Sequence, residues 1–183
     1  MKRHPVLSAV VLTIALAVLL GGGLMIGRAQ VATPAAGGAI GVSTQLLGRV
    51  ASESAPGQAV ALLKITFAPG GSMGAHTHPG DTAIHLLSGT LQYTVVAGEA
   101  RLVRAANGVP SASTPTAVEP MTAGTEFTLN AGDTVYYTGT VLQSERNMSD
   151  QDAVIIASNL RGIDEPARIM SPEGMASPAA GTP

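Results

Sequence analysis

The chain has no cysteine and no tryptophan, and it contains only two phenylalanines and three tyrosines among its 183 residues. Without cysteine there are no disulfides, no thiolate metal ligands and no thiol nucleophile. The shortage of aromatic rings removes the stacking surface on which many proteins hold sugars or flat polyphenols. These absences argue against a disulfide-stabilised scaffold, a cysteine-dependent enzyme and a lectin.

Charge is scarce as well. Charged residues make up 12% of the chain, the formal net charge is −2, and the only basic pair near a terminus is Lys2-Arg3. Proteins that bind nucleic acid depend on clustered lysines and arginines that displace counterions from phosphates. We therefore do not expect nucleic acid as a partner.

The N-terminus has the features of a targeting sequence. The basic start is followed by an apolar run from Pro5 to Gly27, which is the order of a secretory signal peptide. The run is also long enough for a membrane span, which takes about 20 residues, so an uncleaved signal anchor is the alternative. In either case residues 1–28 predict export, and the rest of the chain is expected to be extracellular, periplasmic or membrane-anchored and facing outward. Membrane contact is expected only through this segment.

Composition divides the remainder into three parts. Residues 29–41 are mostly small residues, proline and threonine, and they are expected to form a flexible linker. Residues 166–183 repeat Ser-Pro and end in Ala-Ala-Gly-Thr-Pro, so we expect a disordered tail. Residues 42–165 between them have the size of a single domain.

Within that domain, short alternating apolar runs are separated by glycine-containing turns, and no helical stripe occurs. Many short strands with such turns predict an all-β jelly-roll barrel. Residues 105–123 are rich in Ser, Thr, Pro and Ala and are expected to form a long surface loop. The expected strands are Val60–Phe67, Ala83–Leu87, Leu91–Val96, Ala100–Arg104, Thr125–Leu129, Thr134–Tyr137, Leu142–Arg146 and Ala153–Ala157.

Two histidines follow the first of these strands. The sequence is Gly70, five residues, His76, Thr77, His78, and then a Pro-Gly turn, with Gly89 further along. Residues two apart on a strand face the same side, so His76 and His78 can direct two imidazoles at one metal ion. The alternative is a pair of partly exposed histidines beside a turn.

A second patterned block begins at Gly132 and ends at Asn147. Together the two blocks resemble the paired motifs of the cupin superfamily. The resemblance implies a cupin-like jelly-roll barrel, also called a double-stranded β-helix, with a divalent metal ion such as Fe, Mn or Zn at its mouth. The positions that agree in residue type and spacing are Gly70, His76, His78, Gly89, Gly132 and Asn147.

The chain departs from the family pattern at four positions. Thr82 stands where the family has its glutamate ligand, and Gln143 stands where it has its third histidine. Thr138 and Thr140 replace the proline and glycine of the second motif. The metal site therefore has to be argued from the residues that are present.

Strand alternation places a carboxylate near the two histidines. If Gln143 points into the barrel, Glu145 two residues later points inward as well. A buried carboxylate is costly unless it is paired, protonated or bound to a cation. Our hypothesis is a site of both histidines and Glu145, with Gln143 as a weak fourth ligand. The alternative is a bulge that turns Glu145 outward, where it would pair with a surface charge such as Arg146.

Three further side chains are assigned by the same alternation. His85 is three residues after the inward position of Thr82, so it is expected on the outer face, unless a bulge brings it inward as a third histidine ligand. One of Tyr136 and Tyr137 has to face inward, where its hydroxyl needs a partner.

Two classes of function stay open. One is a metal-dependent enzyme of the dioxygenase or isomerase type that the family resemblance implies. The other is a binding module that holds a metal ion, a small molecule or both in the barrel mouth. The loss of two family ligands favours the binding module, and the sequence shows no base, nucleophile or oxyanion donor besides the candidate ligands. The resemblance also implies a homodimer formed by strand exchange.

Overall fold

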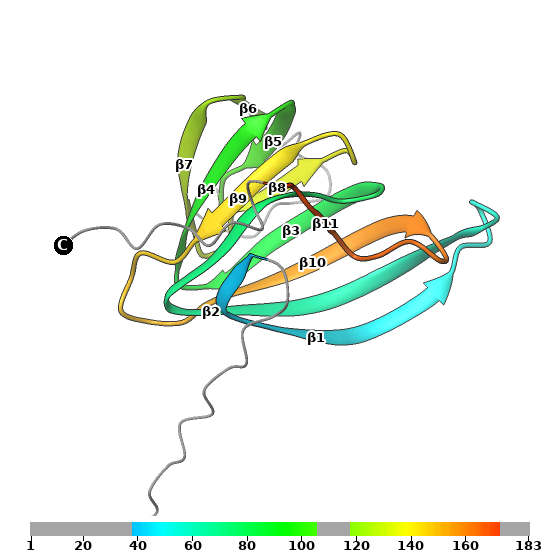
Figure 1. The fold of residues 1–183 in the computed structure, drawn as a ribbon, viewed down its shortest axis with the longest axis horizontal. Coiled ribbons are helices and arrows are strands. Elements are labelled where there is room, and N and C mark those ends of the chain that lie inside the picture. Colours follow the sequence, from blue (N-terminus) through cyan, green and yellow to red (C-terminus); the bar gives the residue numbers. More distant parts are fainter. Residues whose placement is uncertain (1–37, 106–117, 173–183) are drawn as a thin grey trace, which may run out of the picture. The chain divides into compact units, whose positions relative to one another are not determined.

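A computed structural model describes residues 38–105 and 118–172, which fold into an all-β structure (Figure 1). In this part of the chain no helix is long and apolar enough to cross a membrane. The expected signal or anchor, residues 1–28, lies outside the described residues. The strands are β1 (Ala39–Ala51), β2 (Gln58–Thr77), β3 (Asp81–Ser88), β4 (Thr90–Ala97), β5 (Glu99–Val103), β6 (Val118–Thr122), β7 (Thr125–Asn130), β8 (Thr134–Tyr137), β9 (Leu142–Arg146), β10 (Ala153–Gly162) and β11 (Ile169–Met170).

The strands form one antiparallel sheet that closes almost completely on itself. Its order is β6-β5-β8-β3-β10-β2-β9-β4-β7, and β1 and β11 both pair with β2. The two end strands, β6 and β7, are joined by a short turn in which the hydroxyls of Thr122 and Thr125 are 3.3 Å apart. Figure 1 shows β1, β2, β3 and β10 on one side of the barrel and β4, β7 and β9 on the other. The expected all-β barrel is confirmed.

Strand β2 bends between the two sides of the barrel. Its first half pairs with β10 as far as Phe67, and its second half pairs with β9 from Ser72 onward. Between these residues lies Ala68-Pro69-Gly70-Gly71, where Gly70 has φ +72°. The sequence predicts a turn here, and the structure has a sharp bend within one long strand. After the bend, the chain brings His76 and His78 to a cavity that Phe67 also lines.

Asn147 holds this bend in place. Its side-chain amide donates to the backbone carbonyls of Phe67 at 2.9 Å and of Gln151 at 2.7 Å. The backbone carbonyl of Asn147 accepts from the backbone amide of Gly70, and the backbone amide of Asn147 donates to the backbone carbonyl of Gly71. A buried polar side chain is stable only when its hydrogen bonds are satisfied. The asparagine shared with the cupin motif therefore has a structural task, fastening β9 to the bend of β2.

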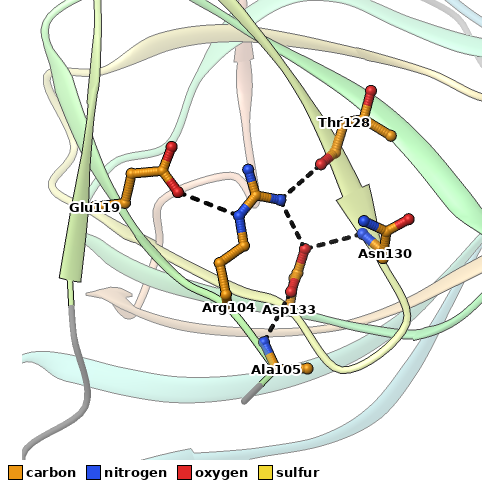
Figure 2. Close-up of polar contacts among 6 residues, drawn as sticks. All are labelled: Arg104, Ala105, Glu119, Thr128, Asn130 and Asp133. Carbon is orange, nitrogen blue, oxygen red and sulfur yellow. Dashed lines mark hydrogen bonds and ion pairs between the residues drawn. The ribbon is translucent and has the colours of Figure 1, made fainter. Parts of the chain in front are cut away.

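A second polar cluster fastens the turn before β8 (Figure 2). The buried Asp133 carboxylate accepts from the backbone amides of Ala105 and Asn130, each at 2.9 Å, and from Nη1 of Arg104 at 3.0 Å. The Arg104 side chain also pairs with the exposed Glu119 of β6. The cluster connects the end of β5 to β6 and to the β7–β8 turn, so its role is to hold these segments together.

The structure has strands at three places where the sequence predicts none. β1 begins at Ala39, inside the expected linker, β6 lies inside the expected loop of residues 105–123, and β11 lies inside the expected tail. Residues 106–117 of that loop are outside the described part. Most side chains of β1 and β6 are exposed, so their sequences lack apolar alternation. These strands form because their backbones complete hydrogen-bonded pairs with β2 and β5.

Gly89 offers a direct check of this barrel geometry. It has φ +79°, as its turn position in the sequence predicts, and an added Cβ would lie 2.6 Å from the carbonyl oxygen of Asp152. Gly57 has φ +80° but no atom within 4 Å of such a Cβ. We expect Gly57→Ala to cost about 1 kcal/mol through backbone strain alone. Gly89→Ala should cost about 2 kcal/mol or more in urea unfolding, because β10 must also shift. Equal losses would contradict the described packing of β3 on β10.

Candidate metal centre

His76 near the end of β2 and His78 just after this strand bring their imidazole rings together. His76 is only 1% exposed, and its Nε2 atom lies 3.1 Å from Nε2 of His78. Two nitrogens that are each about 2.0–2.1 Å from one metal ion are about 2.8–3.0 Å apart in octahedral coordination and about 3.3–3.4 Å apart in tetrahedral coordination. The separation in this protein therefore fits two ligands of a single ion. The expectation that His76 and His78 share one face is confirmed.

Backbone carbonyls fix the orientation of both rings. Nδ1 of His76 lies 2.8 Å from the carbonyl oxygen of Gly74, and Nδ1 of His78 lies 2.8 Å from that of Ala167. A carbonyl oxygen only accepts hydrogen bonds, so each Nδ1 carries the proton and each neutral ring leaves Nε2 bare. Two Nε2 lone pairs then face each other with no proton between them. A cation placed between them satisfies both.

The histidines are also kept neutral. Burial, and to a smaller extent the charge of Arg168, lower the pKa of His76 to about 4, although its hydrogen bond to Gly74 acts in the opposite direction. Burial and the neighbouring His76 lower the pKa of His78 to about 3. Neutral imidazoles are the form in which histidine binds metals. The site is therefore ready to bind an ion at neutral pH without first releasing protons from these rings.

Gln143 lies next to the histidine pair. It is the cross-strand neighbour of His76 in the pairing of β2 with β9, and it is 1% exposed. Its Nε2 atom donates to the hydroxyl of Tyr137 at 2.8 Å, and its Oε1 atom has no hydrogen-bond partner among the described residues. An amide oxygen is an acceptable ligand for a divalent cation. Gln143 thus faces inward, as predicted, with a free acceptor.

Glu145 is buried as predicted, two residues along the same face of β9. Its Oε2 atom lies 3.9 Å from Nδ1 of His76, which is the edge of that ring opposite to the meeting point with His78. Burial raises the pKa of the Glu145 carboxyl to about 8, and the charge of Arg168 acts in the opposite direction. In the metal-free protein the group is mostly protonated at neutral pH. Direct ligation by Glu145 stays a prediction.

Within the described ranges, no three His, Asp or Glu side chains gather closely enough to hold a metal ion by themselves. Thr82, at the position of the family's glutamate, is occupied otherwise, because its hydroxyl accepts from Nδ2 of Asn159 at 2.7 Å. Besides the two histidines, the polar side chains beside the cavity that could contribute a ligand include Gln143 and Glu145.

Comparison with known proteins addresses the fold. No family model and no curated protein matches the chain, but solved structures do. A cupin superfamily protein from Desulfitobacterium hafniense is 13% identical, with a TM-score of 0.43 over 66% of this chain and 77% of that chain. KdgF from Halomonas sp. is 12% identical, with a TM-score of 0.45 over 68% and 83%. These two structures are examples of what the barrel is similar to.

The likeness concerns the fold alone. Oxalate decarboxylase from Bacillus subtilis is 20% identical, with a TM-score of 0.40, over 61% of this chain and only 23% of the decarboxylase. At such identities a shared fold says nothing about substrate or reaction. What the cupin-like barrel does has to be read from its own residues.

The cupin-like barrel encloses a small cavity beside the histidines. The space open to the centre of a water-sized sphere is about 30 Å³, enough for roughly two water molecules. Apolar side chains such as Phe67 and Ile84 line its inner part, and His76, His78 and Gln143 line the polar part. The cavity has room for a small ligand beside the histidines.

Other predicted orientations are confirmed. His85 lies on the opposite face from Thr82 and contacts the hydroxyl of Thr134 at 2.9 Å, so it does not join the histidine pair. Tyr137 is buried and Tyr136 is 46% exposed. Burial and the nearby Glu145 raise the pKa of the Tyr137 hydroxyl, so this group stays protonated.

Sequence reasoning missed several residues around the cavity. Asn159 and Arg161 are buried on β10, and they continue the inward alternation past Ala157, where the expected strand ended. That alternation was a usable signal. Tyr93, the cross-strand neighbour of Glu145, is also buried, and its hydroxyl has no partner among the described residues. Arg168 lines the cavity from a segment expected to be a disordered tail, and its sequence gave no signal.

The buried ionisable groups predict how the stability of the metal-free protein depends on pH. Below pH 6.5 the unfolded chain gains protons that the folded histidines refuse, so stability should rise with pH up to about 6.5. Between pH 6.5 and 8 the folded Glu145 carboxyl keeps a proton that the unfolded chain has lost, so stability should fall by up to about 1.4 kcal/mol per pH unit.

Chemical denaturation from pH 5 to 9 measures this profile. Glu145→Gln should abolish the fall above pH 6.5, because the amide carries no titrating proton. Glu119→Gln is the matched control, since Glu119 is an exposed carboxylate, and it should leave the fall unchanged. A profile that stays flat above pH 6.5 in the wild type would show that the Glu145 carboxyl is ionised in the fold.

Proposed function

We propose that the protein binds one divalent metal ion at the mouth of its cupin-like barrel, through Nε2 of His76 and Nε2 of His78. The observation that carries this proposal is the 3.1 Å approach of the two Nε2 atoms in rings whose Nδ1 atoms both have a backbone carbonyl as partner. Without a cation the two lone pairs oppose each other. With one, both become ligands.

The oxygen ligands come next. Gln143 supplies the free Oε1 atom as a third ligand, and the buried Glu145 stands beside His76 as the only carboxylate at the cavity among the described residues. Two imidazoles with oxygen donors suit Fe(II), Mn(II) or Zn(II). A bound divalent ion supplies a Lewis acid that polarises an oxygen atom of a small ligand. The function best supported is a barrel that holds a metal ion and a small molecule together.

Metal retention tests the site directly. We expect purified untagged protein to retain about one equivalent of Fe, Mn or Zn in elemental analysis. Either His76→Ala or His78→Ala should abolish retention while the protein stays folded, because each change removes one of two indispensable ligands. His85→Ala is the matched control, since His85 lies on the opposite face of its strand, and it should keep the metal. Wild-type protein that takes up no transition metal would refute the proposal.

The same assay separates the two candidate oxygen ligands. Glu145→Gln should weaken metal affinity about tenfold or more if the carboxylate is a ligand or supports His76. Gln143→Ala should weaken it if Oε1 is bound to the ion. Affinity that falls with Gln143→Ala and is unchanged by Glu145→Gln would contradict the ligand role predicted for Glu145.

Export is a second part of the proposal and rests on the sequence of residues 1–28 alone. We expect the barrel to be digested by added protease once the cell wall is permeabilised, while a cytosolic marker stays intact. Full-length protein recovered in the cytosolic fraction would contradict export.

We also propose a homodimer, for which the exposed apolar side chains of Leu46, Leu47 and Val50 on the edge strand β1 offer a surface.

A further inference from the structure

The chain returns to the metal site after its last long strand. Beyond β10 a turn is closed by the amide of Gly162, which donates to the Glu165 carboxylate at 2.8 Å. The Glu165 carbonyl accepts from Nε of the buried Arg161 at 3.0 Å. Pro166 follows this turn, and residues 167–170, which we call the C-terminal strap, then run back along the barrel mouth.

The strap is joined to the strand that carries the histidines. Ile169 pairs with Thr77 and Met170 pairs with His76 in antiparallel register. The carbonyl oxygen of Ala167 is the partner of Nδ1 of His78. One of the two bonds that orient the imidazoles therefore comes from the strap. Without the strap, the ring of His78 would lose the contact that fixes its tautomer.

The strap also brings a cation to the cavity. Arg168 lines the cavity wall. Burial has the largest effect on the pKa of each neighbouring group, lowering it for His76 and His78 and raising it for Glu145. The charge of Arg168 lowers all three pKa values. The ion pairs found in the described ranges involve only Arg104 and His76 as cations. Arg168 thus faces the site with no carboxylate bound to it there.

A second guanidinium adds to the same field. Arg161 is 8% exposed, donates from Nη1 to Oδ1 of Asn159 at 2.8 Å, and lowers the pKa of His78 by its charge, although burial and His76 have larger effects. Its hydrogen-bond partners are neutral oxygen atoms, and the nearby Glu165 carboxylate offsets part of its charge. The candidate ligands His76, His78 and Gln143 are uncharged, and the family's glutamate ligand is replaced by Thr82. A divalent ion here would leave a marked excess of positive charge, because Glu145 is the single acid at the cavity.

We infer that the C-terminal strap completes the metal site and that Arg168 holds a small anionic ligand of the carboxylate type against the ion. This inference rests on the proposed metal-binding function and names the ligand class of that site. An anion offsets the excess charge, and a guanidinium pairs with a carboxylate through two parallel hydrogen bonds. The cavity of about 30 Å³ limits the ligand to a few atoms, the size of formate.

Formate binding to the cobalt-loaded full-length protein tests the inference, because the visible absorption of Co²⁺ reports a change in its ligands. We expect formate to alter the spectrum of the wild type in a saturable way. Formamide, a neutral molecule of the same size, should bind at least tenfold more weakly. Arg168→Gln should weaken formate binding at least tenfold and leave formamide binding within twofold, since only the anion uses the guanidinium. Arg168→Lys, which keeps the charge, should restore part of the affinity.

Arg101→Gln is the matched control. Arg101 is an exposed arginine of β5 and does not line this cavity, so its loss should change neither cobalt content nor formate affinity. If Arg168→Gln fails to retain cobalt, Arg168→Lys decides: tight formate binding supports the inference, and absent formate binding with cobalt retained overturns it.

The results distinguish the inference from the function on which it rests. Wild-type protein that retains no cobalt would refute the metal site and the inference with it. Cobalt retained with equal affinities for formate and formamide would overturn only the anionic ligand. Cobalt retained with equal formate affinity in the wild type and in Arg168→Gln would overturn only the role of Arg168.

Discussion

The site depends on two hydrogen bonds, those from Nδ1 of His76 and of His78 to backbone carbonyls. They determine which nitrogen of each ring is bare and where its lone pair points. The first bond is local, because Gly74 precedes His76 by two residues on the same strand. The second depends on a chain segment that lies 89 positions away at Ala167. The geometry of the pair therefore reports whether the bend of β2 and the C-terminal strap are both in place.

Features governed by short-range periodicity could be predicted from the sequence. The alternation of strands places Gln143 and Glu145 inward, His85 outward and Tyr137 inward, because the side chains of a strand point alternately to its two faces. The positive φ of Gly89 also follows from its place in a turn. These predictions hold because each depends on a few neighbouring residues and on no distant contact.

The remaining features depend on pairing between distant segments. β1 and β6 have mostly exposed side chains, so their place in the sheet is decided by backbone hydrogen bonds to β2 and β5, which a sequence pattern does not display. Only two residues of the strap, those of β11, are paired with another strand, and the strap follows Pro166. The position of Arg168 at the cavity could therefore be found only from the structure. Strand periodicity also could not predict that Glu145 lies near Nδ1 of His76. It predicts the face of the strand on which a side chain lies, but not which edge of a neighbouring ring that side chain approaches.

Some buried polar atoms in the interior of the barrel have no hydrogen-bond partner. Among the described residues, the buried side-chain atoms that lack a hydrogen bond are the Tyr93 hydroxyl, Gln143 Oε1 and Glu145 Oε2. Gln143 and Glu145 share one face of β9, and Tyr93 is paired with Glu145. An unsatisfied buried polar group costs about 1–3 kcal/mol, and apolar residues at these positions would make a more stable barrel. Gln143 and Glu145 line the cavity with the two imidazoles, so the unpaired atoms of these two residues are unfavourable for folding alone and are open to the small ligand or ion proposed above.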